Sequence, residues 1–288
     1  MIVLFGASRL GTSFVTQQAQ ERMLGNYFVD NDAALWGTTV AGLPVLQPIA
    51  DNLLRAQHVI ITSMWTREIY DQLHAFGVAH SRIWVPAKPM FTSMHQRFSP
   101  ERGAVALEVL ETAFESLEHT GLCVFIDCGT LLGLWRDSAL IPWDNDIDVA
   151  VVGQNRSEHE QVAATLERVA VDIGIGTQVS SLDNSSAVTL EVGGITIPVG
   201  IDQSVIRGRR IVNLQNPHFP EVDIDMVMPL SRLPARPSIR VPNKASNYLE
   251  FRYGASWRTP TEQWAFLYGA HDLDIQVLKS LDQLGDAQ

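Results

Sequence analysis

Three aspartates stand at every second position in the stretch "IPWDNDIDVAVV": Asp144, Asp146 and Asp148. Side chains alternate between the two faces of a β-strand, so Asp146 and Asp148 point one way while Ile147 and Val149 point into a core. Two carboxylates side by side repel each other and are costly unless a cation lies between them. Hard divalent ions take oxygen ligands. The pattern therefore predicts a Mg²⁺ or Mn²⁺ site at the start of a buried strand, although an exposed acidic turn remains the alternative interpretation.

The residues before the aspartates predict a phosphate-binding turn. "LCVFID" is typical of a strand, and "CGTLLGLWR" is typical of a glycine turn that enters a short helix. The backbone N–H groups of Gly129 and Thr130 would then hold a phosphate at the helix N-terminus. Arg136 follows within reach of a bound diphosphate, to which a guanidinium binds bidentately, or it forms a salt bridge with Asp137 instead.

This order of strand, Gly-Thr turn, helix and aspartate strand resembles the α+β nucleotidyltransferase fold of the polymerase-beta type. The resemblance implies that the turn holds a phosphate and that the aspartates hold metal ions. A third carboxylate is normally contributed by a neighbouring strand. The segment "EVDIDMVMPL" offers Asp223 and Asp225 for that role, in alternation with apolar residues.

Three segments in the same order resemble the signature of the LicD/fukutin family: "DCGTLLGLWRDSALIPWDNDIDV", "EVDIDMVMPL" and "YLEFRYGASWRTP". The resemblance implies a metal-dependent phosphotransferase that moves a phospho-alcohol, such as phosphocholine or ribitol phosphate, from a CDP-activated donor to a glycan hydroxyl. It implies that Asp146 and Asp148 bind metal ions and that Asp144 assists or binds a second ion. It also implies that Asp223 is the third carboxylate, with Asp225 as a competitor.

The expected mechanism is in-line attack of a sugar hydroxyl on the β-phosphorus of the donor, with CMP leaving. Asp223 or Asp225 would accept the hydroxyl proton. Tyr253, Trp257 and Arg258 in "YGASWRTP" are expected either to face the donor or acceptor or to pack in the core. Two alternatives stay open: a nucleotidyltransferase that moves NMP from a nucleoside triphosphate, and a non-catalytic nucleotide-sugar-binding protein.

The first third of the chain predicts a Rossmann-like α/β domain. "MIVLFGASRLGTSFV" and "YFVDND" suggest a βαβ opening, in which Gly6, Ser8 and Gly11 form a GxSxxG variant and Asp30 would meet a ribose hydroxyl. "DNDAALWGTTVAGLPV" resembles a segment of small N-terminal domains of sugar-modifying enzymes, which implies a nucleotide or nucleotide-sugar ligand. The alternative is a module that only packs or dimerises.

Domain boundaries and partners follow from composition. We expect a Rossmann-like domain over residues 1–88, a linker over 89–100 and a catalytic domain over 101–288, whose first helix has Ser99 as N-cap and Pro100 in its first turn. The net charge of −11 argues against a nucleic-acid partner. The sequence shows no pattern of a membrane span or signal peptide, so we expect a cytoplasmic protein, and a homo-oligomer stays open.

Overall fold

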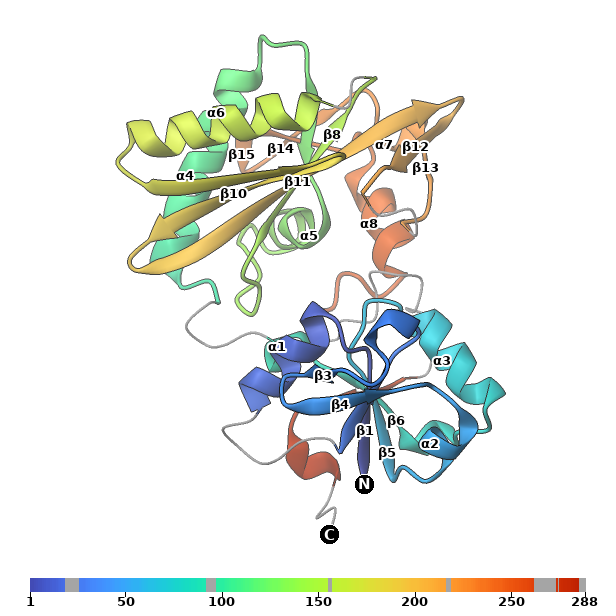
Figure 1. Ribbon diagram of the computed structural model, residues 1–288. Coiled ribbons are helices and arrows are strands. Elements are labelled where there is room, and N and C mark those ends of the chain that lie inside the picture. Colours follow the sequence, from blue (N-terminus) through green and yellow to red (C-terminus); the bar gives the residue numbers. More distant parts are fainter. Residues whose placement is uncertain are drawn as a thin grey trace. The chain divides into compact units, whose positions relative to one another are not determined.

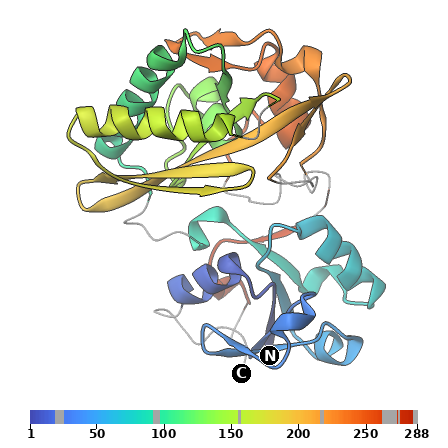
Figure 2. The same cartoon turned by 45° about the horizontal axis from the view of Figure 1, so that its top comes forward.

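The computed structural model of the 288-residue chain describes residues 1–18, 26–91, 97–154, 157–215, 219–261, 273 and 275–284. It divides into two compact units (Figures 1 and 2). The first unit contains Met1–Met94 together with Pro260–Gln288, and the second contains His95–Thr259. None of the helices in these described ranges is both long and apolar enough to cross a membrane.

The first unit is built on a seven-stranded sheet in the order β16-β6-β5-β1-β2-β4-β3, in which only β3 runs antiparallel to its neighbour. Its strands are β1 (Ile2–Phe5), β2 (Tyr27–Val29), β3 (Thr39–Val40), β4 (Leu43–Leu46), β5 (His58–Ile61), β6 (Ile83–Pro86) and β16 (Gln276–Leu278). Its helices are α1 (Arg9–Gln18), α2 (Ala50–Leu54) and α3 (Thr66–Ala75), with short 3-10 turns at Ala33–Leu35, His80–Arg82, Lys88–Met90 and Leu281–Leu284.

Alternation along β1 divides the core of the first unit between the two faces of the sheet. Val3 and Phe5 belong to one apolar cluster, and Ile2 and Leu4 belong to the other. A parallel sheet covered on both faces has near-continuous apolar strands, as the sequence of β1 does. The α/β class expected for this part of the chain is confirmed. Because β1 lies between β5 and β2, the chain changes winding direction there, which is where open α/β sheets bind ligands.

The C-terminal segment corrects the predicted domain division. We expected residues 101–288 to form one domain, but β16 pairs in parallel with β6 and belongs to the first unit. Leu278, Leu281 and Leu284 join the apolar cluster that contains Leu4. The segment is too short for its periodicity to show this long-range pairing.

Leu278→Ala is therefore expected to destabilise the first unit. The side chain is 0% exposed, and truncating a buried leucine costs about 2–5 kcal/mol of unfolding free energy. Urea unfolding of the full chain measures the loss, with the exposed neighbour Lys279→Ala as control. Equal midpoints for the two variants would show that this strand does not contribute to the core.

The second unit contains a mixed sheet and a separate two-stranded ribbon. In the sheet, β11 pairs with β10, β8 and β12; β7 pairs with β8, β9 with β10 and β13 with β12. The strands are β7 (Cys123–Ile126), β8 (Ile147–Val152), β9 (Gly176–Leu182), β10 (Ser185–Val192), β11 (Ile195–Arg207), β12 (Arg210–Asn213), β13 (Val222–Asp223) and, in the ribbon, β14 (Ser231–Leu233) and β15 (Arg236–Val241). The helices are α4 (Pro100–Leu117), α5 (Cys128–Arg136), α6 (Glu158–Asp172), α7 (Ile224–Val227) and α8 (Ala245–Tyr253).

Several local predictions for this unit are confirmed. Helix α4 begins at Pro100, and the Ser99 side chain accepts a hydrogen bond from the backbone N–H of Arg102 (3.3 Å). Strand β7, helix α5 and strand β8 occupy the segments predicted for them. The predicted strand through Asp223 and Asp225 is wrong after Asp223. There the chain turns into α7, because the Asp223 carboxylate caps it by accepting from the Asp225 N–H (2.9 Å).

The central sheet of the second unit has one face that α6 covers and one face, called the acidic face, that carries aspartates. On one face, α6 packs over β11, and the backbone N–H of His159 donates to the Gln203 side chain (3.2 Å). Asp148, Ala150 and Asp202 lie on the opposite face, because neighbours along a strand alternate and residues paired across strands face the same side. The acidic face is the one on which the candidate site lies.

Candidate active site

The start of β8 places Asp148 in register with residues of both neighbouring strands. Asp148 pairs with Gly200 of β11 on one side. On the other side, the backbone N–H of Asp127, which follows β7, donates to the Asp148 carbonyl (3.0 Å). Asp127 and Asp148 thus lie opposite each other on the same face. Asp146 lies two residues earlier and is half-buried at the entrance to the strand.

The Asp148 carboxylate is bonded to the turn that opens α5. Its Oδ2 accepts from the N–H groups of Gly129 (3.0 Å) and Thr130 (3.4 Å), and its own N–H donates to Thr130 Oγ1 (2.9 Å). The two N–H groups thus hold a carboxylate, and phosphate binding at this turn stays a prediction. In this structure the anion is the Asp148 side chain itself.

Asp144 reaches the same turn from the loop before β8. Its side chain is 3% exposed, and its Oδ2 would lie only 2.4 Å from a Cβ placed on Gly129, with Asp148 Oδ2 at 3.6 Å from that position. Both carboxylates therefore lie next to Gly129, and a larger residue there would displace Asp144. Within the described ranges, no three His, Cys, Asp or Glu side chains lie close enough together to form a complete metal cluster.

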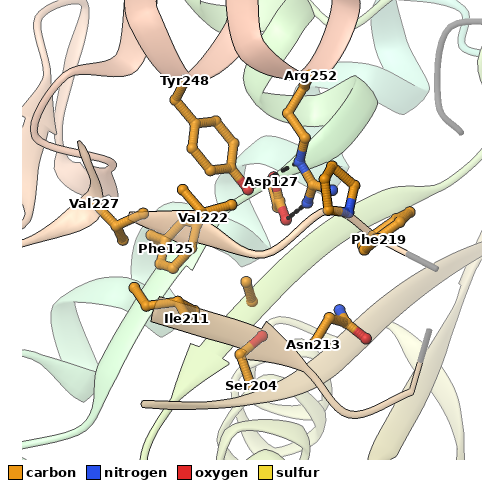
Figure 3. A pocket seen from close by; sticks show the side chains of 12 residues that line it. Phe125, Asp127, Ser204, Ile211, Asn213, Phe219, Val222, Val227, Tyr248 and Arg252 are labelled. Carbon is orange, nitrogen blue, oxygen red and sulfur yellow. Dashed lines mark hydrogen bonds and ion pairs between the residues drawn. The ribbon is translucent and has the colours of Figure 1, made fainter. Parts of the chain in front are cut away.

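A buried ion pair fixes the other side of this turn (Figure 3). Arg252 of α8 donates to Asp127 Oδ2 (2.8 Å), and Tyr248 Oη donates to Asp127 Oδ1 (2.7 Å). The side chains of Arg252 and Asp127 are only 7% and 8% exposed. Asp127 also caps α5 by accepting from the Cys128 N–H (2.7 Å), so α8 holds the first turn of α5 through one carboxylate. Sequence analysis missed Asp127, Tyr248 and Arg252 as site residues.

These side chains line a pocket of the second unit, which Figure 3 shows between α8 and the strands of the sheet. The Arg252 guanidinium lies 4.2 Å from the centre of the Phe219 ring at this pocket. The pocket is also lined by Phe125, Ala150, Ser204, Ile211, Asn213, Pro220, Val222 and Val227.

Asp202 is a further carboxylate on the acidic face that sequence analysis did not identify. It pairs with Ala150 of β8, two positions beyond the Gly200–Asp148 pair, and it accepts a hydrogen bond from Asn213 Nδ2 (3.3 Å). Burial raises the pKa of the Asp202 carboxyl, the Asn213 hydrogen bond opposes this rise, and the negative charge of Asp127 adds to it. The only signal in the sequence is an acid in the apolar strand "IPVGIDQSV", which marks a polar position on one face.

Asp223 ends β13, and Asp225 lies in the first turn of α7. Asp223 pairs with Arg210 of β12. Arg210 in turn pairs with Arg207, which lies at the end of β11, seven positions after Gly200. The residue before Asp223, Val222, lines the same pocket as Asp127. Both carboxylates contact the exposed Arg209 (3.3 and 2.6 Å). The role of Asp223 or Asp225 as the third carboxylate stays a prediction.

The expected substrate-contact residues form a second group around the ends of α5 and α8. Arg136 forms the salt bridge with Asp137 (2.7 Å) that we considered as an alternative, and its Nη1 donates to the Trp257 carbonyl (3.4 Å). The Arg258 guanidinium lies over the Trp257 ring, 4.3 Å from its centre. Tyr253 is buried at the end of α8, and burial raises the pKa of its hydroxyl well above the usual value.

The glycine motif of the first unit lies at the carboxyl end of β1. Gly6 has a φ of +115°, and a Cβ on Gly11 would lie 2.1 Å from the Gly6 carbonyl oxygen, so both positions require glycine. Ser8 is exposed. The Asp30 carboxylate accepts from the Ala7 N–H (2.7 Å), which ties β2 to the loop and uses the acid we assigned to a ribose. Nucleotide binding at Gly6, Ser8, Gly11 and Asp30 stays a prediction.

Comparison with known families supports a transferase. Residues 121–188 match the family described as LicD/FKTN/FKRP, nucleotidyltransferase domain. The match contains β7, α5, the three aspartates and β8, but less than half of the chain. No curated protein matches the chain significantly.

Solved structures show only distant similarity. Cid1 poly(U) polymerase bound to MgGTP is 13% identical over 36% of this chain and 33% of its own, with a TM-score of 0.26. A putative oxidoreductase from Magnetospirillum magnetotacticum MS-1 is 14% identical over 74% of this chain and 77% of its own, with a TM-score of 0.24. The dehydrogenase MviM from Clostridium difficile is 10% identical over 86% and 88%, with a TM-score of 0.23. The chain thus spans about a third of the length of Cid1, and similarity at this level carries no functional argument.

Proposed function

We propose that the second unit is a metal-dependent phosphotransferase that moves a phospho-alcohol from a CDP-activated donor to a hydroxyl of a cell-surface glycan. The observation that carries this proposal is the gathering of Asp144 and Asp148 around Gly129, within the segment that matches the LicD family. Carboxylates that share a site with a phosphate-binding turn suit phosphoryl chemistry.

Asp146 and Asp148 are the proposed Mg²⁺ or Mn²⁺ ligands, and Asp144 assists them. Carboxylate oxygens are the ligands that a hard divalent ion prefers, and such an ion keeps further positions for water and phosphate. When bound, such an ion neutralises charge on the diphosphate. If Asp148 turns from the Gly129 and Thr130 N–H groups toward the ion, those groups become free for a donor phosphate.

We propose Asp202, ahead of Asp223 and Asp225, as the third carboxylate. Its support is that Asp202 lies on the same face as Asp148, two positions along the neighbouring strand. In the proposed reaction, an acceptor hydroxyl oxygen forms a bond to the β-phosphorus of the donor. The bond from that phosphorus to the bridging oxygen breaks, and CMP leaves. The hydroxyl proton passes to a carboxylate, for which the half-buried Asp202 is suited by its raised pKa.

The donor is identified by measuring CMP release with Mg²⁺ across CDP-choline, CDP-ribitol, CDP-glycerol and CDP-ethanolamine. We expect one donor to release CMP when a glycan acceptor is present. Pyrophosphate release from CTP or ATP, without CMP release from any donor, would favour a nucleotidyltransferase of the same fold. The absence of both products would favour a binding protein.

A further inference from the structure

Two buried hydrogen-bond donors near the site have no partner in the described part of the chain. They are Tyr253 Oη and Trp257 Nε1, whose residues are 7% and 5% exposed. Native proteins leave few buried polar atoms unpaired, because each one costs folding free energy. Two such atoms within five residues therefore call for a ligand or a bound water.

Both atoms belong to a segment that is attached to the aspartate site. Tyr253 directly follows Arg252, which pairs with Asp127 opposite Asp148. Burial raises the pKa of the Tyr253 hydroxyl, and Cys128 and Asp148 add smaller contributions to this rise. Arg136 of α5 donates to the Trp257 carbonyl (3.4 Å) and ties the rest of the segment to the same helix.

The chemistry of the two atoms restricts the ligand. An indole N–H only donates, and a phenol with a raised pKa keeps its proton and can donate it. The missing partner must therefore supply acceptor oxygens. Asp148 Oδ2 already accepts from Gly129 and Thr130, and the Arg258 guanidinium over the Trp257 ring adds positive charge. A phosphate fits this combination, because its non-bridging oxygens accept several bonds and its charge is attracted by arginine.

We propose that Tyr253 Oη and Trp257 Nε1 donate hydrogen bonds to non-bridging oxygens of the phosphoryl group that is transferred. This inference rests on the proposed function for the identity of that group. On this account the unpaired Tyr253 hydroxyl lowers the unfolding free energy of the free protein, and its hydrogen bond to the phosphoryl group stabilises the complex. Stability and activity often oppose each other in this way at functional sites.

The test compares Tyr253→Phe with Tyr248→Phe, two substitutions on the same helix that each remove one hydroxyl. The Tyr248 hydroxyl donates to Asp127, whereas the Tyr253 hydroxyl has no described partner. Thermal unfolding is measured without ligand, and binding of inorganic pyrophosphate with Mg²⁺ is measured by calorimetry. For Tyr253→Phe we expect an unchanged or higher Tm and a pyrophosphate affinity about 10-fold weaker or more. For Tyr248→Phe we expect a lower Tm.

Three results would overturn the inference. If Tyr253→Phe binds pyrophosphate with the wild-type affinity, the Tyr253 hydroxyl of the wild type is satisfied by water and not by a phosphate. A Tm loss equal to that of Tyr248→Phe would mean a structural role, and no pyrophosphate binding by the wild type would mean that no phosphate site exists. If Tyr253 is required for pyrophosphate binding but no CDP-alcohol releases CMP, the phosphate site stands and the proposed donor is wrong.

Discussion

We expect Asp202→Asn to lower turnover by on the order of 1000-fold and Asp223→Asn to retain most of it. The register places Asp202 on the same face as Asp148, two positions along the neighbouring strand. Asparagine has nearly the same shape but lacks the charge and the proton acceptor that the reaction requires. Asp223 is bonded to Arg209 and caps α7, and asparagine can also cap a helix. The measurement is steady-state turnover of both variants on the donor that the wild type uses.

The fold of Asp202→Asn is expected to survive, because burial already disfavours the charge of this carboxyl and raises its pKa. A Tm equal to or above that of the wild type is the control for correct folding. If Asp223→Asn loses turnover and a folded Asp202→Asn does not, the third carboxylate is Asp223.

We expect Arg252→Met to lower the unfolding free energy of the second unit by about 3–5 kcal/mol. Methionine preserves much of the volume but leaves the buried Asp127 carboxylate without its cation. The same carboxylate caps α5, so the loss is expected to reach the Gly129-Thr130 turn as well. Chemical unfolding of the full chain measures this change.

Two further variants separate the ion pair from a general effect of losing an arginine. Arg232→Met removes a bridge to Glu118 that is largely exposed, and we expect little change in stability. The double variant Asp127→Asn, Arg252→Met is expected to recover part of the loss, because the uncompensated charge is gone. If Arg252→Met and Arg232→Met unfold at the same denaturant concentration, the buried pair does not fix this turn.

The local structure of the site could be predicted because it is encoded in short segments. Alternation in "DIDVAVV" predicted β8, and the Gly-Thr turn predicted the start of α5. The Ser99 cap and Pro100 predicted the start of α4 for the same reason. Each of these signals lies within about one turn or strand of the element that it determines.

What the sequence did not show depends on contacts between distant segments. Asp202 became a candidate only through the register of β11 against β8, and Arg252 through its contact with Asp127, 125 positions earlier. Asp223 was chosen from a motif, and the alternating pattern around it did not reveal the helical turn that its own side chain caps. The strand β16 likewise joins a sheet whose other strands end near residue 86. Pairing over such separations leaves no periodic pattern in the chain.

The central claim is that Asp148 takes part in a metal-dependent transfer of a phospho-alcohol. The most direct measurement is CMP release from the CDP-alcohol panel with Mg²⁺, by the wild type and by Asp148→Asn in parallel, each checked for folding by its thermal transition. We predict that the wild type releases CMP from one donor, that EDTA stops the release, and that a folded Asp148→Asn shows none above background. Undiminished release by a folded Asp148→Asn, or release that persists in EDTA, would contradict the account.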